Sequence, residues 1–334
     1  MPVSRTPVVV AYCLARTFVV AGLLVLAAAE AVAQQDFNGD GKADILWRNS
    51  TTGDVAIWLM NGASFASGGY IATIDLKWQI VGVGDFDGDG KADILWRNTA
   101  TGENVIWLMD GTSIRANSAP IYPVSDINWQ VVGVGDFDGD GKADILWYNT
   151  STGDVAVWLM DGTSVRTGSG LASNWFPNYS FWVGDFDGNG TADILLSYNL
   201  MNDSPIIWLM NGINVAFNNW ITTPDTGWVI AGIGDFNGDG KANILWRNPS
   251  TGGNVIWMMD RWSIITGSAP IPTASDSNWQ VVGVRDFNGD GKADTLWRNI
   301  NTGENVIWLM DGTSMLAGSA PIPTVSDPSW KVVP

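Results

Sequence analysis

The chain has 334 residues, with 17 lysines and arginines against 34 aspartates and glutamates, which gives a formal net charge of −17. A surface this acidic repels the phosphates of nucleic acids and anionic membranes, so we expect neither nucleic acid binding nor membrane insertion. The chain has no histidine and a single cysteine, Cys13, so catalytic triads that use histidine are excluded.

The first 33 residues have the pattern of an export signal. Two arginines form a basic start, residues 18–29 form an apolar stretch, and residues 31–33 (AVA) offer a small-residue cleavage site. The apolar stretch is shorter than the roughly 20 residues that span a bilayer, which argues against a membrane anchor. We therefore expect a signal peptide at residues 1–33 and a protein that is secreted, periplasmic or at the cell surface.

A nine-residue acidic motif, DFDGDGKAD in its fullest form, occurs in six close copies. The copies begin at residues 36, 85, 136, 185, 235 and 286. Each unit of about 50 residues also contains an apolar stretch such as WQVVGVG before the motif, a run such as ILWRN after it, and a second run such as NVIWLMDG. These short runs are rich in Val, Ile and Trp and are bounded by Gly, Asn, Asp and Pro, which is typical of strands joined by hairpin turns.

Four strands in each of six repeats predict an all-β fold. We expect a six-bladed β-propeller of four-stranded antiparallel blades, forming a single domain over residues 34–334. Blade 1 begins at its acidic motif and lacks the WQVVGVG strand, whereas residues 329–334 (SWKVVP) match that strand. We expect this C-terminal strand to pair with blade 1 and close the ring, which leaves no unpaired edge.

The acidic motif places oxygen-bearing side chains at positions 1, 3, 5 and 9 and glycines at positions 4 and 6. Oxygen ligands at alternate positions of a tight loop suit a hard cation such as Ca2+, which takes about six to eight oxygens. The glycines permit the positive φ angles that such a loop needs. The side chain at position 7 varies, so its backbone carbonyl is the expected ligand. A metal-free, solvated turn is the alternative, and the six-fold recurrence favours calcium.

The expected calcium ligands follow this pattern in all six loops. They are Asp36, Asn38, Asp40, Lys42 and Asp44 in loop 1; Asp85, Asp87, Asp89, Lys91 and Asp93 in loop 2; Asp136, Asp138, Asp140, Lys142 and Asp144 in loop 3; Asp185, Asp187, Asn189, Thr191 and Asp193 in loop 4; Asp235, Asn237, Asp239, Lys241 and Asn243 in loop 5; and Asp286, Asn288, Asp290, Lys292 and Asp294 in loop 6. Loops 2 and 3 have four carboxylates and loop 5 has two. We therefore expect up to six Ca2+ ions, with the weakest binding in loop 5.

The stretch VGVGDFDGDGKADILW resembles the FG-GAP or VCBS-type repeat, and the resemblance covers residues 36–334. Such repeats occur in the propeller of integrin α subunits, in propeller lectins and in secreted bacterial proteins. The resemblance implies a propeller with calcium bound between the first and second strands of each blade. It does not imply one activity, because a fold hosts many functions. Six blades differ from the seven of integrins.

Tryptophan is abundant, with 20 residues in the chain and typically three in each repeat, such as Trp78, Trp96 and Trp107. Their positions within apolar strands favour packing between blades, and stacking on sugar rings is the alternative. A second recurring feature is the arginine of the WRN runs. We expect these arginines to pair with an aspartate of a neighbouring blade, with a polar ligand as the alternative. They are Arg48, Arg97, Arg247 and Arg298.

Blades 4 and 5 break the repeat. Leu196 replaces the second-strand tryptophan, residues 197–205 replace the usual turn, and Arg261 and Trp262 replace Gly-Thr. Drift in a tolerant repeat is favoured over one specialised pocket. The expected function is a calcium-stabilised, lectin-like module that binds an extracellular glycan and is not an enzyme. A protein-adhesion module is the alternative, and a polysaccharide lyase or hydrolase is the third hypothesis.

Overall fold

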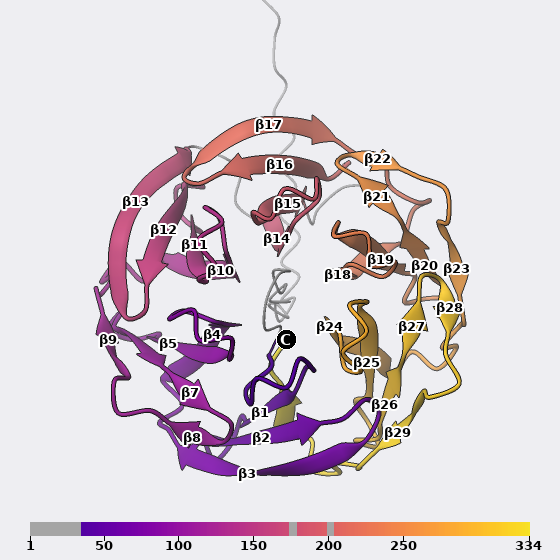
Figure 1. Ribbon diagram of the computed structural model, residues 1–334, viewed down its shortest axis with the longest axis horizontal. Helices are drawn as coiled ribbons and strands as arrows, with labels where there is room; N and C mark the ends of the chain where they lie inside the picture. Colours follow the sequence, from indigo (N-terminus) through magenta and orange to yellow (C-terminus); the bar gives the residue numbers. More distant parts are fainter. Residues whose placement is uncertain (1–34, 174–178, 199–203) are drawn as a thin grey trace, which may run out of the picture.

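The computed structural model describes residues 35–173, 179–198 and 204–334. Six four-stranded antiparallel sheets stand around a central axis as the blades of a ring (Figure 1). The predicted six-bladed β-propeller is therefore confirmed. The predicted signal peptide lies outside the described residues. Within the described residues there is no helix long and apolar enough to cross a membrane.

Each blade runs from an inner strand beside the axis to an outer strand at the rim. In that order, blade 1 contains β30 (Trp330–Val332), β1 (Ile45–Asn49), β2 (Asp54–Met60) and β3 (Phe65–Thr73); blade 2 contains β4 (Trp78–Gly84), β5 (Asp93–Asn98), β6 (Asn104–Trp107) and β9 (Ala119–Ile121); and blade 3 contains β10 (Trp129–Gly135), β11 (Asp144–Asn149), β12 (Val155–Asp161) and β13 (Ser164–Ala172). Blade 4 contains β14 (Tyr179–Gly184), β15 (Asp193–Tyr198), β16 (Ile206–Asn211) and β17 (Asn214–Trp220); blade 5 contains β18 (Val229–Gly234), β19 (Asn243–Arg247), β20 (Asn254–Trp257) and β23 (Ala269–Ile271); and blade 6 contains β24 (Trp279–Arg285), β25 (Asp294–Asn299), β26 (Asn305–Trp308) and β29 (Ala320–Ile322).

Three blades carry an additional two-stranded hairpin near the rim (Figure 1). The hairpins are β7 (Met109–Asp110) with β8 (Ser113–Ile114), β21 (Met259–Asp260) with β22 (Ser263–Ile264), and β27 (Met310–Asp311) with β28 (Ser314–Met315). In blades 1, 3 and 4 the corresponding residues instead belong to the longer third and fourth strands.

The second strand of each blade is buried on both faces because neighbouring blades cover it. All six residues of β5 are buried, whereas the outer strand β3 is mostly exposed. Close packing of the inner strands requires glycine. A Cβ atom added at Gly82 would lie 2.3 Å from Cγ2 of Val134 on the next inner strand. The glycine of the WQVVGVG run therefore allows adjacent blades to approach at the axis.

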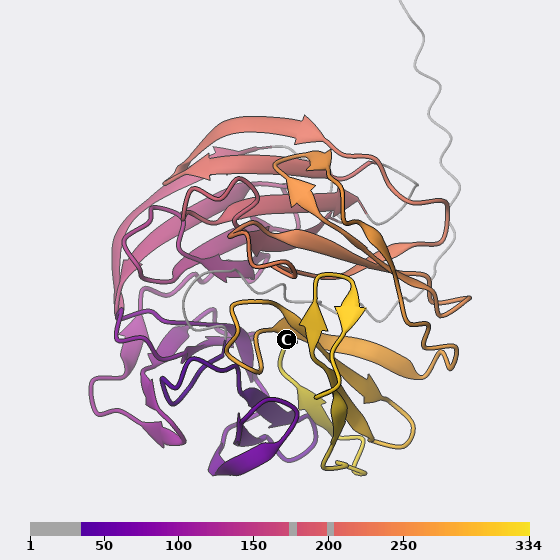
Figure 2. The ribbon, with the colours of Figure 1, turned by 45° about the vertical axis from the view of Figure 1, so that its right-hand side comes forward.

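The two ends of the propeller meet in blade 1. The C-terminal strand β30 pairs antiparallel with β1, with Trp47 opposite Val332 and Asn49 opposite Trp330. The sheet order is β3-β2-β1-β30, so the innermost strand of this blade comes from the end of the chain (Figures 1 and 2). The predicted closure is confirmed, and it gives β1 a hydrogen-bonded partner on each side.

Tryptophans of the second strands pack between blades. Trp47, Trp96, Trp147 and Trp297 are each 1% exposed. The guanidinium carbon of Arg48 lies 5.1 Å from the ring centre of Trp96 on the next blade, and Arg298 lies 5.1 Å from Trp47 across the closure. These contacts agree with the favoured interpretation, in which the tryptophans pack between blades.

The expected pairing of the WRN arginines with aspartates is wrong. Within the described residues Arg48 forms no ion pair; it donates hydrogen bonds to the carbonyls of Gly53 and Ile74 and stacks on the neighbouring tryptophan. Carbonyl oxygens and an aromatic face satisfy a buried guanidinium without burying a second charge.

Candidate metal sites

In blades 2 to 6 each acidic loop joins the first strand to the second, as the resemblance implied, and in blade 1 the loop lies directly before the second strand β1. In loop 2, the glycines at positions 4 and 6, Gly88 and Gly90, have φ angles of 76° and 82°. Their amides donate hydrogen bonds to the carboxylate of Asp85 at position 1, both at 2.7 Å, and the amide of Asp89 donates a third at 3.1 Å. The carboxylate at position 1 thus holds the turn in shape, and the other five loops repeat this arrangement.

The carboxylate at position 9 of loop 2 ties the loop to β7, the hairpin strand that follows the third strand. Asp93 is fully buried and accepts hydrogen bonds from the amides of Phe86 at 2.9 Å and Met109 at 2.8 Å. Desolvation by burial raises the pKa of Asp93 to about 8, although the two hydrogen bonds act in the opposite direction. The pKa is raised in the same way for the other position 9 aspartates, to about 7 or 8. They are Asp44, Asp144, Asp193 and Asp294.

At position 3, one side-chain oxygen in each of four loops is buried without a hydrogen-bond partner. These atoms are Oδ1 of Asp87, Asp138, Asp187 and Asn237. Buried polar atoms normally have a partner, so each one points to a group that completes the loop. In loops 2, 3 and 4, carboxylate oxygens at positions 1, 3 and 9 lie within 4.8 Å of one another.

These donor sets fit a hard divalent cation. All the converging atoms are oxygens, and a cation among them would favour the ionised form of the buried carboxylate at position 9. The acidic clusters of several repeats could therefore hold metal ions, with oxygens of positions 1, 3 and 9 as the core of each site.

The roles of positions 5 and 7 as ligands stay predictions. Asp89 at position 5 accepts the amide of Lys91 at 3.0 Å, which closes the turn. The ammonium of Lys91 at position 7 lies 2.6 Å from Asp110 of its own blade, and Lys42 donates to Asn61 at 2.7 Å. These side chains are engaged away from the loop, so the backbone carbonyl of position 7 is the group left for a cation.

Arginines that sequence analysis missed lie against three of the loops. Arg115 is 2.8 Å from Asp87 and also contacts Asp89. In loop 3, Arg166 contacts Asp138 and Asp140, and in loop 4 the Nε of Arg261 is 3.9 Å from Asp187. Arg115 and Arg166 both follow the first aspartate of their loop by 30 residues, which was a detectable signal. A guanidinium at this place competes with a metal cation for the same carboxylates.

Neighbouring loops are bonded to one another around the ring. The carbonyl of Asp36 accepts the amide of Ala92 in the next loop at 2.8 Å, and the carbonyl of Phe37 accepts the amide of Gly111 at 2.7 Å. The same two bonds recur at each junction, including the closing one, where Ala43 donates to Asp286 at 2.7 Å. The loops therefore form a continuous collar at one end of the axis.

The irregular positions of blades 4 and 5 fit into this framework. Leu196 is buried in the core between blades 3 and 4. Arg261 adopts a φ of 58° in place of the usual glycine and still donates its amide to the carbonyl of Phe186 at 2.8 Å. Residues 199–203 of the irregular turn lie outside the described residues.

Comparison with known proteins identifies the repeat. The family model of the FG-GAP-like repeat matches residues 36–96, 85–147, 136–196 and 235–297, which together make up more than half of the chain. The chain belongs to the FG-GAP-like repeat family. No curated protein matches it.

Solved structures resemble this FG-GAP-like propeller in fold. The Tc holotoxin pore of Photorhabdus luminescens has 14% identity and a TM-score of 0.53, and the match covers 85% of this chain and 15% of the toxin chain. A protein from Lactobacillus plantarum has 11% identity and a TM-score of 0.49, with 85% and 82% covered, and a luciferin-regenerating enzyme has 10% identity and a TM-score of 0.49, with 93% and 94% covered. The FG-GAP-like chain thus spans only a small part of the toxin, and this likeness concerns the fold.

An aspartate at position 9 of loop 5 should stabilise the protein when calcium is bound and destabilise it when calcium is removed. Asn243 accepts the amide of Phe236 at 2.9 Å, but its buried Nδ2 has no partner. We expect Asn243→Asp to raise the free energy of unfolding by about 1–3 kcal/mol in saturating calcium, because a second acceptor and a charge are gained. In chelator we expect it to lower that free energy, because the new buried charge has no counter-ion. Urea denaturation in both conditions measures the two effects.

The control for this variant is Asn38→Asp, which adds a charge at position 3 of loop 1, a half-buried site that leaves the third strand untouched. We expect it to lack the destabilisation in chelator. An effect of Asn243→Asp with the same sign and size in calcium and in chelator would contradict a metal site in loop 5.

Removing the arginine beside loop 2 should strengthen cation binding there. Arg115→Ala takes away a positive charge next to two carboxylates, so we expect about three- to tenfold tighter calcium binding at one site. Arg115→Lys keeps the charge and serves as the matched control. Calorimetric titration with calcium measures both. Unchanged affinity in Arg115→Ala would mean that the guanidinium does not compete with the cation.

Proposed function

We propose that this FG-GAP-like propeller is an exported, calcium-stabilised module that binds carbohydrate. The oxygen-only donor sets and the unpartnered buried oxygens at position 3 support calcium as the cation. The signal pattern of residues 1–33 supports export. Calcium outside cells is plentiful enough for sites with affinities of about 0.1 to 1 mM, the range of extracellular modules.

Chelation should destabilise the ring. Each bound ion adds stability that grows with the logarithm of one plus the ratio of the free calcium concentration to the Kd of its site, and several sites add together. We expect EGTA to lower the melting temperature by about 10 °C relative to millimolar calcium. Readdition of calcium should restore the original value, and the same concentration of magnesium should restore little of it. Melting temperatures that agree in calcium and in EGTA would refute calcium stabilisation.

The observation that supports carbohydrate as the ligand is an aromatic pocket in blade 6. Its volume is about 310 Å³, and it is lined by Trp279, Trp297 and Trp308 together with polar groups of residues 273–276. Trp297 is buried and lies 4.6 Å from Trp308, ring centre to ring centre, while Trp279 and Trp308 are partly exposed. Aromatic faces beside hydroxyl and carboxylate groups suit a sugar ring, which has an apolar face and a polar edge.

Similar trios of tryptophan occur in the other regular blades, which favours several equivalent clefts. The trios are Trp330, Trp47 and Trp58 in blade 1; Trp78, Trp96 and Trp107 in blade 2; Trp129, Trp147 and Trp158 in blade 3; and Trp228, Trp246 and Trp257 in blade 5. Blade 4 departs from the pattern, with Leu196 in its second strand. Repeated weak clefts on one rigid ring suit multivalent binding to a repetitive glycan.

A protein-adhesion module is the second candidate. The outer strand β17 exposes Phe217 to 68% and Trp220 to 57%, and the outer strand β3 exposes Tyr70 to 62%. Exposed aromatic residues on rim strands are typical anchors of protein interfaces.

Substitution in one blade should remove one sugar site. We expect a glycan array to identify a neutral oligosaccharide that binds in calcium, and calorimetry to give several sites per chain. Trp308→Ala should reduce the number of sites by one, because that cleft loses its stacking face, while Trp308→Phe retains a ring and serves as the control. No binding on the array, combined with loss of protein binding in Trp220→Ala, would favour the adhesion module.

A further inference from the structure

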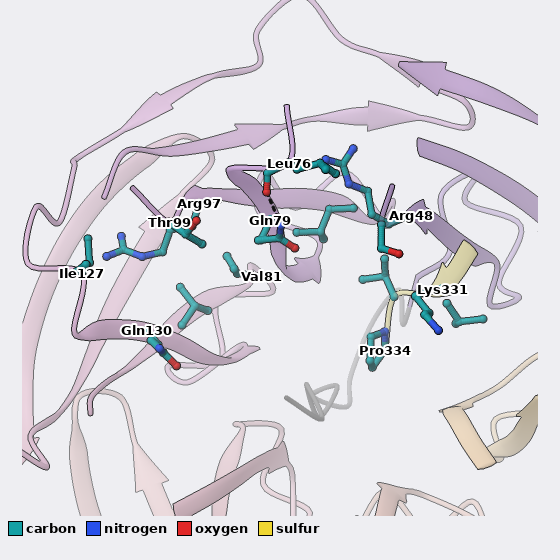
Figure 3. Close-up of a pocket in the computed structure, with 15 residues that line it drawn as sticks. Arg48, Leu76, Gln79, Val81, Arg97, Thr99, Ile127, Gln130, Lys331 and Pro334 are labelled. Atoms are coloured by element: carbon teal, nitrogen blue, oxygen red, sulfur yellow. Dashed lines mark hydrogen bonds between the residues drawn. The ribbon is translucent and has the colours of Figure 1, made fainter. Parts of the chain in front are cut away.

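A pocket lies beside the axis of the ring, among the inner strands of blades 1, 2 and 3. Its volume is about 650 Å³. It is lined by Gln79 and Gln130, the second residues of the inner strands β4 and β10, and by Lys331 of β30 (Figure 3). The strands β4 and β10 end at their acidic loops five residues further on, a distance of about 17 Å along an extended strand. This end of the pocket therefore lies away from the acidic loops of blades 2 and 3, and the pocket shares no lining residue with the tryptophan pocket of blade 6.

The pocket is positively charged in a strongly negative protein. None of its 15 lining residues is an aspartate or glutamate, although the chain carries a net charge of −17. Three lining residues are cationic: Arg48, Arg97 and Lys331. The two guanidinium groups are buried and donate to backbone carbonyls, so they contribute charge and not a free donor. Lys331 is exposed and has no ion-pair partner within the described residues.

A further positive charge lies beneath the floor of the pocket. Arg285, the last residue of β24, is 1% exposed and donates from Nη2 to the carbonyl of Val333 at 3.1 Å. Val333 lines the pocket, so one residue separates the guanidinium from the cavity. Nε and Nη1 of Arg285 have no acceptor within the described residues.

Arg285 also breaks the repeat at this position. Four blades have glycine immediately before the acidic motif, namely Gly84, Gly135, Gly184 and Gly234. A buried guanidinium without a counter-charge is strongly unfavourable, because desolvation of the ion is not repaid by a partner. An anion in the pocket above it would supply the missing charge.

We propose that the axial pocket binds a ligand that carries a carboxylate, with Lys331 as its ion-pair partner and Arg285 as a second positive charge below. The amides of Gln79 and Gln130 and the hydroxyls of Ser50 and Thr99 line the same space and suit the hydroxyl groups of a sugar acid. This proposal does not depend on sugar binding in the tryptophan clefts, because no residue is shared between the two pockets.

The probe is a matched pair, D-glucuronate and D-glucose, which differ at the sixth carbon by a carboxylate in place of a hydroxymethyl group. Calorimetry with the intact protein in calcium should give one glucuronate site per chain, with at least about tenfold weaker binding of glucose, since charge-assisted hydrogen bonds are the stronger ones. Raising the salt concentration should weaken glucuronate binding, because the partner lysine is exposed to screening.

Two substitutions test the assigned charges. We expect Lys331→Glu to weaken glucuronate binding by at least about tenfold, because attraction becomes repulsion. Lys77→Glu makes the same change on an exposed lysine outside the pocket lining and should leave the affinity unchanged. Arg285→Met should weaken binding by a few-fold while the melting temperature is retained or raised, because an apolar side chain replaces an uncompensated buried charge.

Three outcomes would overturn the proposal. Equal affinities for glucose and glucuronate would show that the protein does not recognise the carboxylate. Unchanged glucuronate affinity in Lys331→Glu would place the site elsewhere, for instance at calcium in the acidic loops. Unchanged affinity in Arg285→Met would mean that Arg285 does not act as the second positive charge of the site.

Discussion

The fold depends on a buried carboxylate at position 9 of the acidic loops. In loop 2, Asp93 begins the second strand, accepts an amide from within its own loop and accepts another from Met109 on the third-strand side. One side chain thus connects three segments of a blade. Full burial makes the charged form costly, which is why the pKa rises to about 8. Oxygens from positions 1 and 3 converge on the same place, so the group that would stabilise this charge is a cation held by the same loop.

The buried carboxylate of one loop affects the whole ring, because hydrogen bonds join each loop to the next blade. Each loop offers the carbonyls of positions 1 and 2 to amides of the next blade, and the last junction joins Asp286 to Ala43. On the outer side of this collar, tryptophans fill the space between blades, with Arg298 stacked on Trp47 at the closure. A loop that loses its shape would weaken two blades at once. Cation binding at any one loop is therefore expected to contribute to cohesion beyond its own blade.

The periodic features of the molecule could be predicted from the sequence, and the features that depend on distant neighbours could not. The spacing of the acidic motif predicts six blades, and SWKVVP at residues 329–334 predicts the closing strand, because each repeat carries the same signal. The stacking of Arg48 on Trp96 was missed, since the sequence alone does not tell which group faces a buried guanidinium. The contact of Arg115 with Asp87 was missed because a hairpin brings together residues that are far apart in the chain. Arg285 takes a place where four other blades have glycine, but only the structure shows that it is buried and that two of its nitrogens lack an acceptor within the described residues.

The two ends of the axis divide structural and binding roles. The end with the acidic loops is constrained, because almost every polar atom there holds a turn, a neighbouring loop or a candidate cation. The other end begins with the first residues of the inner strands, whose side chains differ between blades: Gln79, Gln130 and Lys331 occupy equivalent positions, and Val229 takes that place in blade 5. Different side chains at these equivalent positions break the six-fold symmetry, and the inner strands of these blades keep the same backbone pairing. A propeller can therefore acquire one specific axial site while its collar remains unchanged, and Lys331 in the pocket lining is one such difference between blades.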